Sequence, residues 1–168
     1  GLNPDSQQGD KVILDILKRC GGKFKPVEGG YHFDRSLLKA TEIDLADCPD
    51  LGPILFTLGS FCSGETVIRN AGRLRLKESD RIDAMRDELQ KMGARIDVEG
   101  DSVHIQGVAL HAPNAPLSGH NDHRIVMALA VAAIASGLPA LLCGAEAVEK
   151  SWPAFWNVLR SLGAKIEL

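Results

Sequence analysis

The spacing of apolar and polar positions divides this chain into short helices and short strands. Apolar residues recur every three or four positions where helices are expected and alternate with polar residues where strands are expected. Helices are predicted near residues 8–20, 51–62, 78–92, 123–135 and 150–162. Strands are predicted near 23–26, 30–34, 41–45, 65–69, 94–98, 102–106, 139–143 and 164–167. The fold class is therefore α/β, and two helices that are apolar nearly all round, 51–62 and 123–135, should be buried.

One helix-end pattern occurs three times along the chain. Its copies are LKRCGGKFK at 17–25, LQKMGARID at 89–97 and LRSLGAKIE at 159–167. In each copy an amphipathic helix should stop at a glycine, because a glycine adopts the left-handed conformation of a helix cap at little cost. A strand should follow each glycine.

A second pattern occurs twice. Residues 50–72 and 122–146 both run from an aspartate, expected to cap a helix, through an apolar helix to Ser-Gly, a short strand and another glycine. The two patterns together predict a structural unit of about 70 residues that holds two helices and several strands. We expect βαβαββ-like units packed into a single compact domain over 1–168. The units should fall at about 1–70 and 71–142, with an incomplete end at 143–168.

The segment LRLKESDRI at 74–82 places cations where a helix is expected to begin. Lys77 and Arg81 are four positions apart at the start of the predicted helix 78–92. A helix N-terminus carries partial positive charge, so a cation there costs about 0.3–1 kcal/mol. Glu78 and Asp80 offset part of this cost, and a solvated helix start of mixed charge is the simplest interpretation.

Two further helices repeat this arrangement. Arg124, with His123 beside it, opens the predicted helix 123–135, and Lys150 opens the predicted helix 150–162. Three helix starts with cations suggest that the helices gather around an anion, because phosphate and carboxylate groups bind both free backbone N–H groups and arginine side chains. Carboxylates beside such cations, Glu78 and Asp50 among them, could exchange protons with the ligand.

Composition narrows the choice of function. The formal net charge of −3 gives no basic field for nucleic acid, and no run of about 18 apolar residues suggests a membrane span. The four cysteines have no CxxC spacing, which favours a reducing cytoplasm over a disulfide framework. His120 and His123 form an HxxH pair without a third ligand nearby, so no metal site is expected. The opening GLNPDSQQGD is more typical of a chain's interior than of its beginning.

These motifs resemble one known family. LRLKESDRI followed by AMRDELQKMGA, together with NDHRIVMALA and SQQGD, is similar to the C-terminal half of the 5-enolpyruvylshikimate 3-phosphate synthases, and the resemblance covers essentially the whole chain. It implies an inverse α/β barrel fold of two similar domains, each made of three βαβαββ units. This chain would supply most of the second domain and lack part of its first unit.

The resemblance also implies an activity. The family transfers the enolpyruvyl group of phosphoenolpyruvate to the 5-hydroxyl of shikimate 3-phosphate and releases phosphate, in the shikimate pathway of aromatic amino acid biosynthesis. No metal or redox cofactor is needed. The family's N-terminal domain supplies the other half of the site, so the isolated chain should bind substrates weakly and be inactive. We expect a cytoplasmic monomer.

The resemblance assigns three residues to catalysis. Asp50 matches the carboxylate at the reacting hydroxyl, although a helix N-cap worth about 1 kcal/mol would also explain it. Glu78 matches the carboxylate that protonates the enol carbon, and helix-start compensation is its alternative. Lys77 matches a lysine that contacts shikimate 3-phosphate near the reacting hydroxyl.

Further residues are assigned to binding. Arg81 and Arg124 match two guanidinium groups that hold phosphoenolpyruvate, where a bidentate fork suits the ligand better than a lysine does. Lys150 resembles the family's late lysine at the phosphate of phosphoenolpyruvate. His123 lies beside this site and is otherwise typical of a structural histidine. Arg73 stands where some members carry an asparagine that contacts shikimate 3-phosphate, so that contact is in doubt.

Two other functions remain open. The transferase that acts on UDP-N-acetylglucosamine shares the fold, but it would favour a reactive loop cysteine, and the cysteines here lie on or beside apolar elements. A non-catalytic domain that binds anions through the same cations is the second alternative. Amide shifts on titration with shikimate 3-phosphate would separate these functions.

Overall fold

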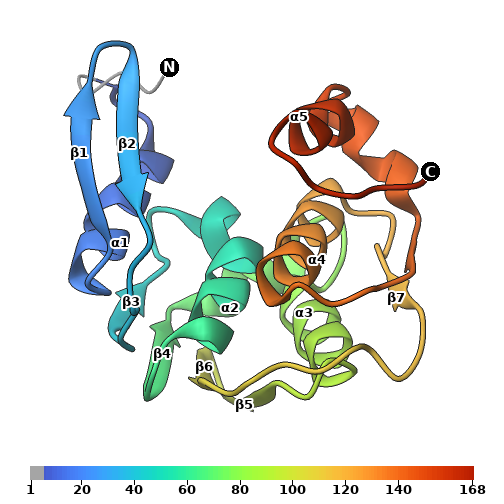
Figure 1. Cartoon of the computed structure of the whole chain (residues 1–168). Helices are drawn as coiled ribbons and strands as arrows, with labels where there is room; N and C mark the ends of the chain where they lie inside the picture. The colour runs from blue at the N-terminus through green and yellow to red at the C-terminus, as the bar shows by residue number, and fades with distance from the viewer. Residues whose placement is uncertain (1–5) are drawn as a thin grey trace.

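The computed structural model describes residues 6–168 and shows a mixed α/β chain, which confirms the predicted class (Figure 1). The α-helices of this part are α1 (Ile13–Arg19), α2 (Gly52–Phe61), α3 (Arg81–Gln90), α4 (His123–Ser136) and α5 (Phe155–Ser161). The 3-10 helices are η1 (Gly9–Val12), η2 (Pro49–Leu51), η3 (Ala71–Leu76) and η4 (Ala145–Lys150). The strands are β1 (Lys23–Val27), β2 (Gly30–Asp34), β3 (Glu42–Asp44), β4 (Glu65–Arg69), β5 (Arg95–Glu99), β6 (Ser102–Gln106), β7 (Leu117–Ser118) and β8 (Leu142–Cys143).

The largest sheet has four strands in the order β3-β4-β6-β5. β3 and β4 are parallel and are connected through α2, whereas β4 pairs with β6 and β6 with β5 in the antiparallel sense. The chain order from β3 to β6 therefore reads β-α-β-α-β-β. Figure 1 shows α2, α3 and α4 grouped in the centre of the molecule, and each of the three contacts the other two.

The internal repeat extends to the strand registers. β7 and β8 pair in parallel across α4 as β3 and β4 do across α2: Leu117 faces Leu142, and Ile43 faces Ile68, each residue 74 positions earlier. The hairpin β1–β2 likewise has the register of β5–β6, offset by 72 residues. The division of the chain near residues 70 and 142 remains a prediction, because a period can be cut at any phase.

The three glycine helix ends have the predicted left-handed backbone. Gly21, Gly93 and Gly163 have φ values of +83°, +87° and +96°. At the second of them, the Gly93 N–H donates to the Gln90 carbonyl and the next N–H donates to the Leu89 carbonyl. The other two ends make the same pair of bonds. The glycines thus satisfy carbonyl groups that the end of a helix leaves without partners.

Several predicted boundaries were wrong. The helix expected at 78–92 begins at Arg81, because the Asp80 side chain caps it by accepting from the N–H groups of Ile82 and Asp83. The helix expected at 150–162 begins at Phe155, and Lys150 ends the 3-10 helix η4 instead.

The strand expected at 164–167 is also absent from the described chain, and residues 139–143 form only the short strand β8. A strand needs a pairing partner, and the equivalent strand β5 pairs with β6, which follows it in the chain. Among residues 6–168, no strand pairs with residues 164–167. The backbone there instead contacts the preceding helix, since Arg160 Nε donates to the Ile166 carbonyl.

The two apolar helices are buried, as predicted. In α2, Leu55 and Phe56 are fully buried, and in α4 Ile125 and Leu129 are. The two helices are linked where the Thr57 hydroxyl donates to the Ala128 carbonyl at 3.0 Å. No helix within residues 6–168 combines the length and apolarity needed to cross a bilayer. This packing brings the first turns of α2, α3 and α4 together.

Candidate active site

Asp50 lies in η2, immediately before α2, and its carboxylate is not a helix cap. The predicted N-cap role is wrong, because Leu51 occupies the N-cap position of α2 and no side chain caps that helix. The Asp50 oxygens bind side chains from other elements instead. Half-buried at the point where α2, α3 and α4 begin, this carboxylate can receive cations from several directions.

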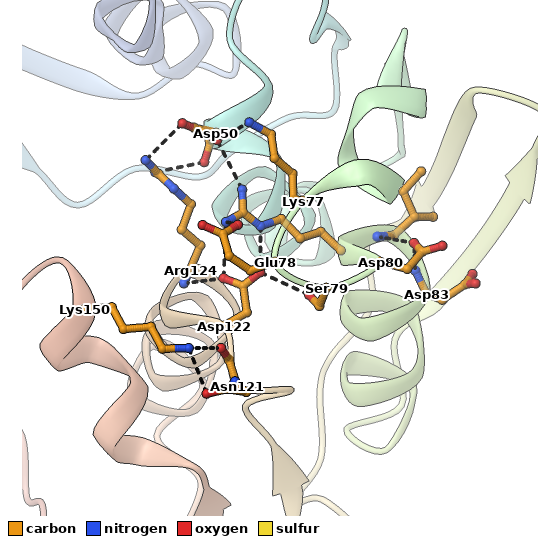
Figure 2. A network of polar contacts seen from close by, with 12 residues as sticks. Asp50, Lys77, Glu78, Ser79, Asp80, Asp83, Asn121, Asp122, Arg124 and Lys150 are labelled. Atoms are coloured by element: carbon orange, nitrogen blue, oxygen red, sulfur yellow. Dashed lines mark hydrogen bonds and ion pairs between the residues drawn. The ribbon is translucent and has the colours of Figure 1, made fainter.

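Three predicted binding residues converge on Asp50 (Figure 2). The Oδ1 atom of Asp50 lies 3.0 Å from Lys77 Nζ and 3.1 Å from Arg81 Nη1. Arg124 approaches from α4: its Nη2 lies 3.2 Å from Asp50 Oδ2, and its Nη1 donates to the Asp50 carbonyl at 3.1 Å. The structure therefore places Lys77, Arg81 and Arg124 around one anionic group.

Asp50 is held in its charged form by these cations. Burial raises the pKa of the Asp50 carboxyl, but the hydrogen bond from Lys77 and the charges of Arg124, Lys77 and Arg81 outweigh burial. The pKa therefore lies below its usual value. A ligand anion that drew these cations away would remove the cause of the lowering and make Asp50 a stronger base.

Arg81 links this cluster to the interior. Its side chain is only 1% exposed, and its Nε donates to Asp122 Oδ2 at 2.8 Å while its Nη2 donates to Asp122 Oδ1 at 3.2 Å. The same Nη2 lies 2.6 Å from Glu78 Oε2. One guanidinium group thus joins three carboxylates from separate segments, those of Asp50, Glu78 and Asp122.

Asp122 is a partner that the sequence analysis did not assign to the site. It is fully buried and caps α4 by accepting from the Arg124 N–H, and it also accepts from the Ser79 hydroxyl at 3.0 Å. Burial raises the pKa of Asp122, but the hydrogen bond and charge of Arg81 outweigh it and lower that pKa. The predicted helix cap at this position is confirmed. The signal available in the sequence was the aspartate of the NDHR motif, which had been assigned only to a helix cap.

Lys150 lies beside this cluster rather than in it. Its Nζ donates to both the carbonyl and the side-chain Oδ1 of Asn121, at 2.5 and 2.8 Å. Figure 2 shows Lys150 reaching Asn121, below the contacts around Asp50 in this view. Asn121 directly precedes Asp122, so Lys150 and Arg81 hold adjacent residues of one turn.

The two remaining candidates make different contacts. Arg73 is exposed on η3 and donates to the Ala46 carbonyl at 3.1 Å, away from the cations around Asp50. His123 begins α4, and its buried Nδ1 has no hydrogen-bond partner among the described residues. The His120 ring is bound to Glu88 at 3.0 Å. Within residues 6–168, no three His, Cys, Asp or Glu side chains are arranged to hold a metal ion.

The exposed charged groups around Asp50 can bind an anion. Lys77 and Arg124 are partly exposed, as are the carboxylates of Asp50 and Glu78. The charges of Lys77 and Arg124 are neutralised by the Asp50 carboxylate. A phosphate or carboxylate ligand can replace that carboxylate because it offers the same acceptor oxygens. Two carboxylates, those of Asp50 and Glu78, lie beside these cations, and a carboxylate can accept a proton.

Comparison with known proteins points to one family. The sequence profile of EPSP synthase (3-phosphoshikimate 1-carboxyvinyltransferase) matches residues 1–159. The 3-phosphoshikimate 1-carboxyvinyltransferase of Clostridium kluyveri is 42% identical and covers 99% of this chain, which spans 39% of that relative. The enzyme of the same name from Brachyspira hyodysenteriae is 43% identical, and the match covers 99% of this chain and 40% of that relative. The chain therefore spans about two fifths of the length of these relatives.

Solved structures show the same fold. EPSP synthase from Acinetobacter baumannii superimposes with a TM-score of 0.80 at 29% identity, over 99% of this chain and 41% of that one. The enolpyruvyl transferase NikO from Streptomyces tendae superimposes with a TM-score of 0.73 at 22% identity, over 94% and 36%. The predicted enolpyruvyl transferase-like fold is confirmed.

Proposed function

The chain belongs to the EPSP synthase (3-phosphoshikimate 1-carboxyvinyltransferase) family, and from this membership we propose that it supplies half of an enolpyruvyl transferase active site. The reaction joins phosphoenolpyruvate to the 5-hydroxyl of shikimate 3-phosphate and releases phosphate. The observation that carries the proposal is the convergence of Lys77, Arg81 and Arg124 on the Asp50 carboxylate, since both substrates are polyanions.

The contacts of Asp50 suggest how the site exchanges anions. Asp50 neutralises Lys77 and Arg124, and we propose that a phosphate or carboxylate group of the substrate takes its place at these two cations. Arg81 keeps Asp122 as its buried partner and offers its Nη1 atom, which contacts Asp50, to the ligand. Released from these cations, Asp50 gains basicity and accepts the proton of the 5-hydroxyl.

Glu78 serves the other proton transfer. As the hydroxyl oxygen bonds to the central carbon of phosphoenolpyruvate, Glu78, which has first taken up a proton from solvent, donates it to the methylene carbon, which becomes a methyl group. The tetrahedral intermediate then loses phosphate, and one methyl proton returns to a base, which restores the double bond. The short contact between Glu78 and Arg81, 2.6 Å, fixes the carboxyl beside the site until substrate arrives.

Lys150 completes the binding side. It contacts the turn that precedes α4, and we assign its ammonium group to the phosphate of phosphoenolpyruvate. His123 and Arg73 are assigned to the margin of the site. Their contacts in the ligand-free chain do not involve Asp50.

Family membership and the internal repeat support a domain assignment. We assign residues 1–168 to a single C-terminal domain, and we propose that a second domain of the same enzyme supplies the other half of the site. Since the chain spans about two fifths of its relatives, we expect weak substrate binding and no turnover by these 168 residues alone. Enolpyruvyl transfer by the isolated chain would contradict this expectation. We further propose a monomer in the cytoplasm, where the buried thiols of Cys20, Cys48 and Cys62 stay reduced.

A titration tests the proposed function. Shikimate 3-phosphate is added to the isotope-labelled chain, with and without phosphoenolpyruvate, and amide shifts are followed by NMR. Shifts centred on Lys77, Arg81 and Arg124 support the proposal. Replacing Arg124 with Gln should abolish them, whereas replacing Arg95, an exposed cation on β5, should not. Shifts elsewhere, or none, would favour a non-catalytic domain.

A further inference from the structure

A second buried carboxylate, Glu88, lies outside the group of cations around Asp50. It occupies α3 seven residues after Arg81, so the two side chains lie on one side of the helix. Its side chain is only 4% exposed. A buried charge requires partners, so the contacts of Glu88 show what it holds in place.

Glu88 binds the segment that leads into α4. Its Oε2 atom accepts from the Ser118 N–H at 2.8 Å and from Lys91 Nζ at 2.7 Å, and its Oε1 lies 3.0 Å from His120 Nε2. Burial raises the pKa of Glu88, but the hydrogen bonds from Lys91, the Ser118 amide and His120 outweigh it and lower that pKa. The carboxylate is therefore an ionised acceptor at neutral pH.

The bound segment, Ser118–Asp122, is an unusual turn. His120 and Asn121 both have left-handed backbones, with φ values of +49° and +53°. Residues other than glycine adopt this conformation at a cost, so neighbouring contacts must maintain it. Gly119 packs so closely that a Cβ atom there would lie 2.4 Å from Val126 and 3.0 Å from the Cys143 carbonyl.

The same turn supplies the partners of two predicted binding residues. Asn121 accepts both hydrogen bonds of Lys150, and Asp122 accepts two of those that Arg81 donates. α3 therefore holds the turn at both ends: Glu88 holds its start at Ser118, and Arg81 holds its end at Asp122. The left-handed residues lie between these two contacts.

We propose that Glu88 is a positioning residue, which fixes the Ser118–Asp122 turn so that Asn121 and Asp122 present their oxygens to Lys150 and Arg81. That this geometry serves a substrate site rests on the proposed function, whereas the effect of Glu88 on the turn does not. Without the charge of this carboxylate, its hydrogen bonds with the Ser118 N–H and the His120 ring weaken, and the turn loses one of the contacts that hold it.

The test compares three variants of the 168-residue chain in the absence of ligand. Glu88→Gln keeps the size of the side chain and removes its charge, and His120→Ala removes one of its partners. Asp87→Asn is the matched control, because it removes the adjacent carboxylate of the same helix, which is exposed and pairs with Arg86. Three NMR signals are followed: Ser118 amide exchange, the Asn121 side-chain amide and the Arg81 Nε–H.

In Glu88→Gln we expect Ser118 amide exchange to be at least about tenfold faster, with shifts of the Asn121 and Arg81 signals. His120→Ala should move the same signals less, and Asp87→Asn should leave them unchanged. A change at Ser118 alone, with the Asn121 and Arg81 signals at their original positions in both test variants, would overturn the proposal. So would equal changes in the control.

The functional consequence is measured separately. Shikimate 3-phosphate should bind Glu88→Gln about five- to tenfold more weakly than it binds the original chain, which corresponds to about 1–1.4 kcal/mol. If the original chain shows no binding while the Arg81 signal still moves in Glu88→Gln, the proposed function fails and the positioning role stands. If binding occurs and Glu88→Gln alters neither the turn nor the affinity, the positioning role fails and the proposed function stands.

Discussion

Arg81 and Asp122 form a two-point ion pair in the interior, with Nε 2.8 Å from Oδ2 and Nη2 3.2 Å from Oδ1, and the two side chains are 1% and 0% exposed. Burial disfavours the charged form of Arg81, but Asp122, Glu78 and Asp50 outweigh it and raise its pKa. The pair joins the start of α3 to the start of α4. It therefore fixes the position from which Arg81 reaches Asp50.

Replacing Arg81 with Met should destabilise the fold strongly. Asp122 would remain buried without its cation, which typically costs about 3–5 kcal/mol. Arg75→Met is the control: Arg75 pairs with Asp80 and Asp83 on the surface, and loss of such a pair should cost about 0–1 kcal/mol. The free energy of unfolding, measured by urea denaturation, tests the difference. Equal losses in the two variants would contradict a structural role for the buried pair.

Stability should fall in acid because of Asp122. Its folded-state pKa is lowered by Arg81, so the unfolded chain binds more protons as the pH drops. The stabilisation is complete above the unfolded pKa of about 3.9 and is lost as the pH falls toward the lowered folded-state pKa. Urea unfolding between pH 7 and pH 2.5 measures this slope. In Asp122→Asn the slope should be shallower over that window, and an unchanged slope would contradict the assignment.

Removing the Asp50 carboxylate should strengthen anion binding. In Asp50→Ala, Lys77 and Arg124 lose the internal group that competes with a ligand, so inorganic phosphate should bind about tenfold more tightly, or about 1.4 kcal/mol. Asp47→Ala is the matched control, since it makes the same change in net charge at an exposed neighbouring position. Calorimetric titration measures both affinities. Equal affinities in the two variants would show that Asp50 does not compete with the ligand.

Lys150 should matter for binding more than for stability. It is exposed and bonds only to Asn121 among the described contacts, so Lys150→Ala should change the free energy of unfolding by less than about 1 kcal/mol. Its loss should weaken phosphate binding about threefold to tenfold, because one cation leaves the ligand's surroundings. Lys165→Ala, an exposed lysine near the C-terminus, is the control. A large stability loss without a change in affinity would contradict the assignment.

Local sequence signals predicted much of this structure. The glycine helix ends and the roughly 70-residue period are encoded by neighbouring residues, and both are present. The cations predicted at two helix starts, Arg81 and Arg124, do lie together, since both contact Asp50, whereas the ligand anion that they were expected to share stays a prediction. Lys150 is not a helix-start residue, because it is the last residue of η4 and residues 151–154 separate it from α5. Lys77 likewise lies before α3, as the residue that follows η3.

The features that the sequence did not predict depend on how separate helices approach each other. Asp122 and Glu88 have ordinary surface-type sequences around them, and only the packing of α3 against α4 buries them. Glu88 flanks the apolar stripe of Met85, Leu89 and Met92, a position where burial could have been suspected. The left-handed backbones of His120 and Asn121 carry no glycine signal, so sequence reasoning had no reason to expect them.

The shared guanidinium of Arg81 has a consequence for the route by which this chain unfolds. Separating α3 from α4, or from the segment that leads into α2, would expose a charge whose partners are spread over both neighbours. Partly unfolded intermediates that keep one of these helices docked without the others are therefore disfavoured. The centre of the molecule should melt as a single cooperative block, while the hairpin β1–β2, which pairs with no other strand of the described chain, can open by itself.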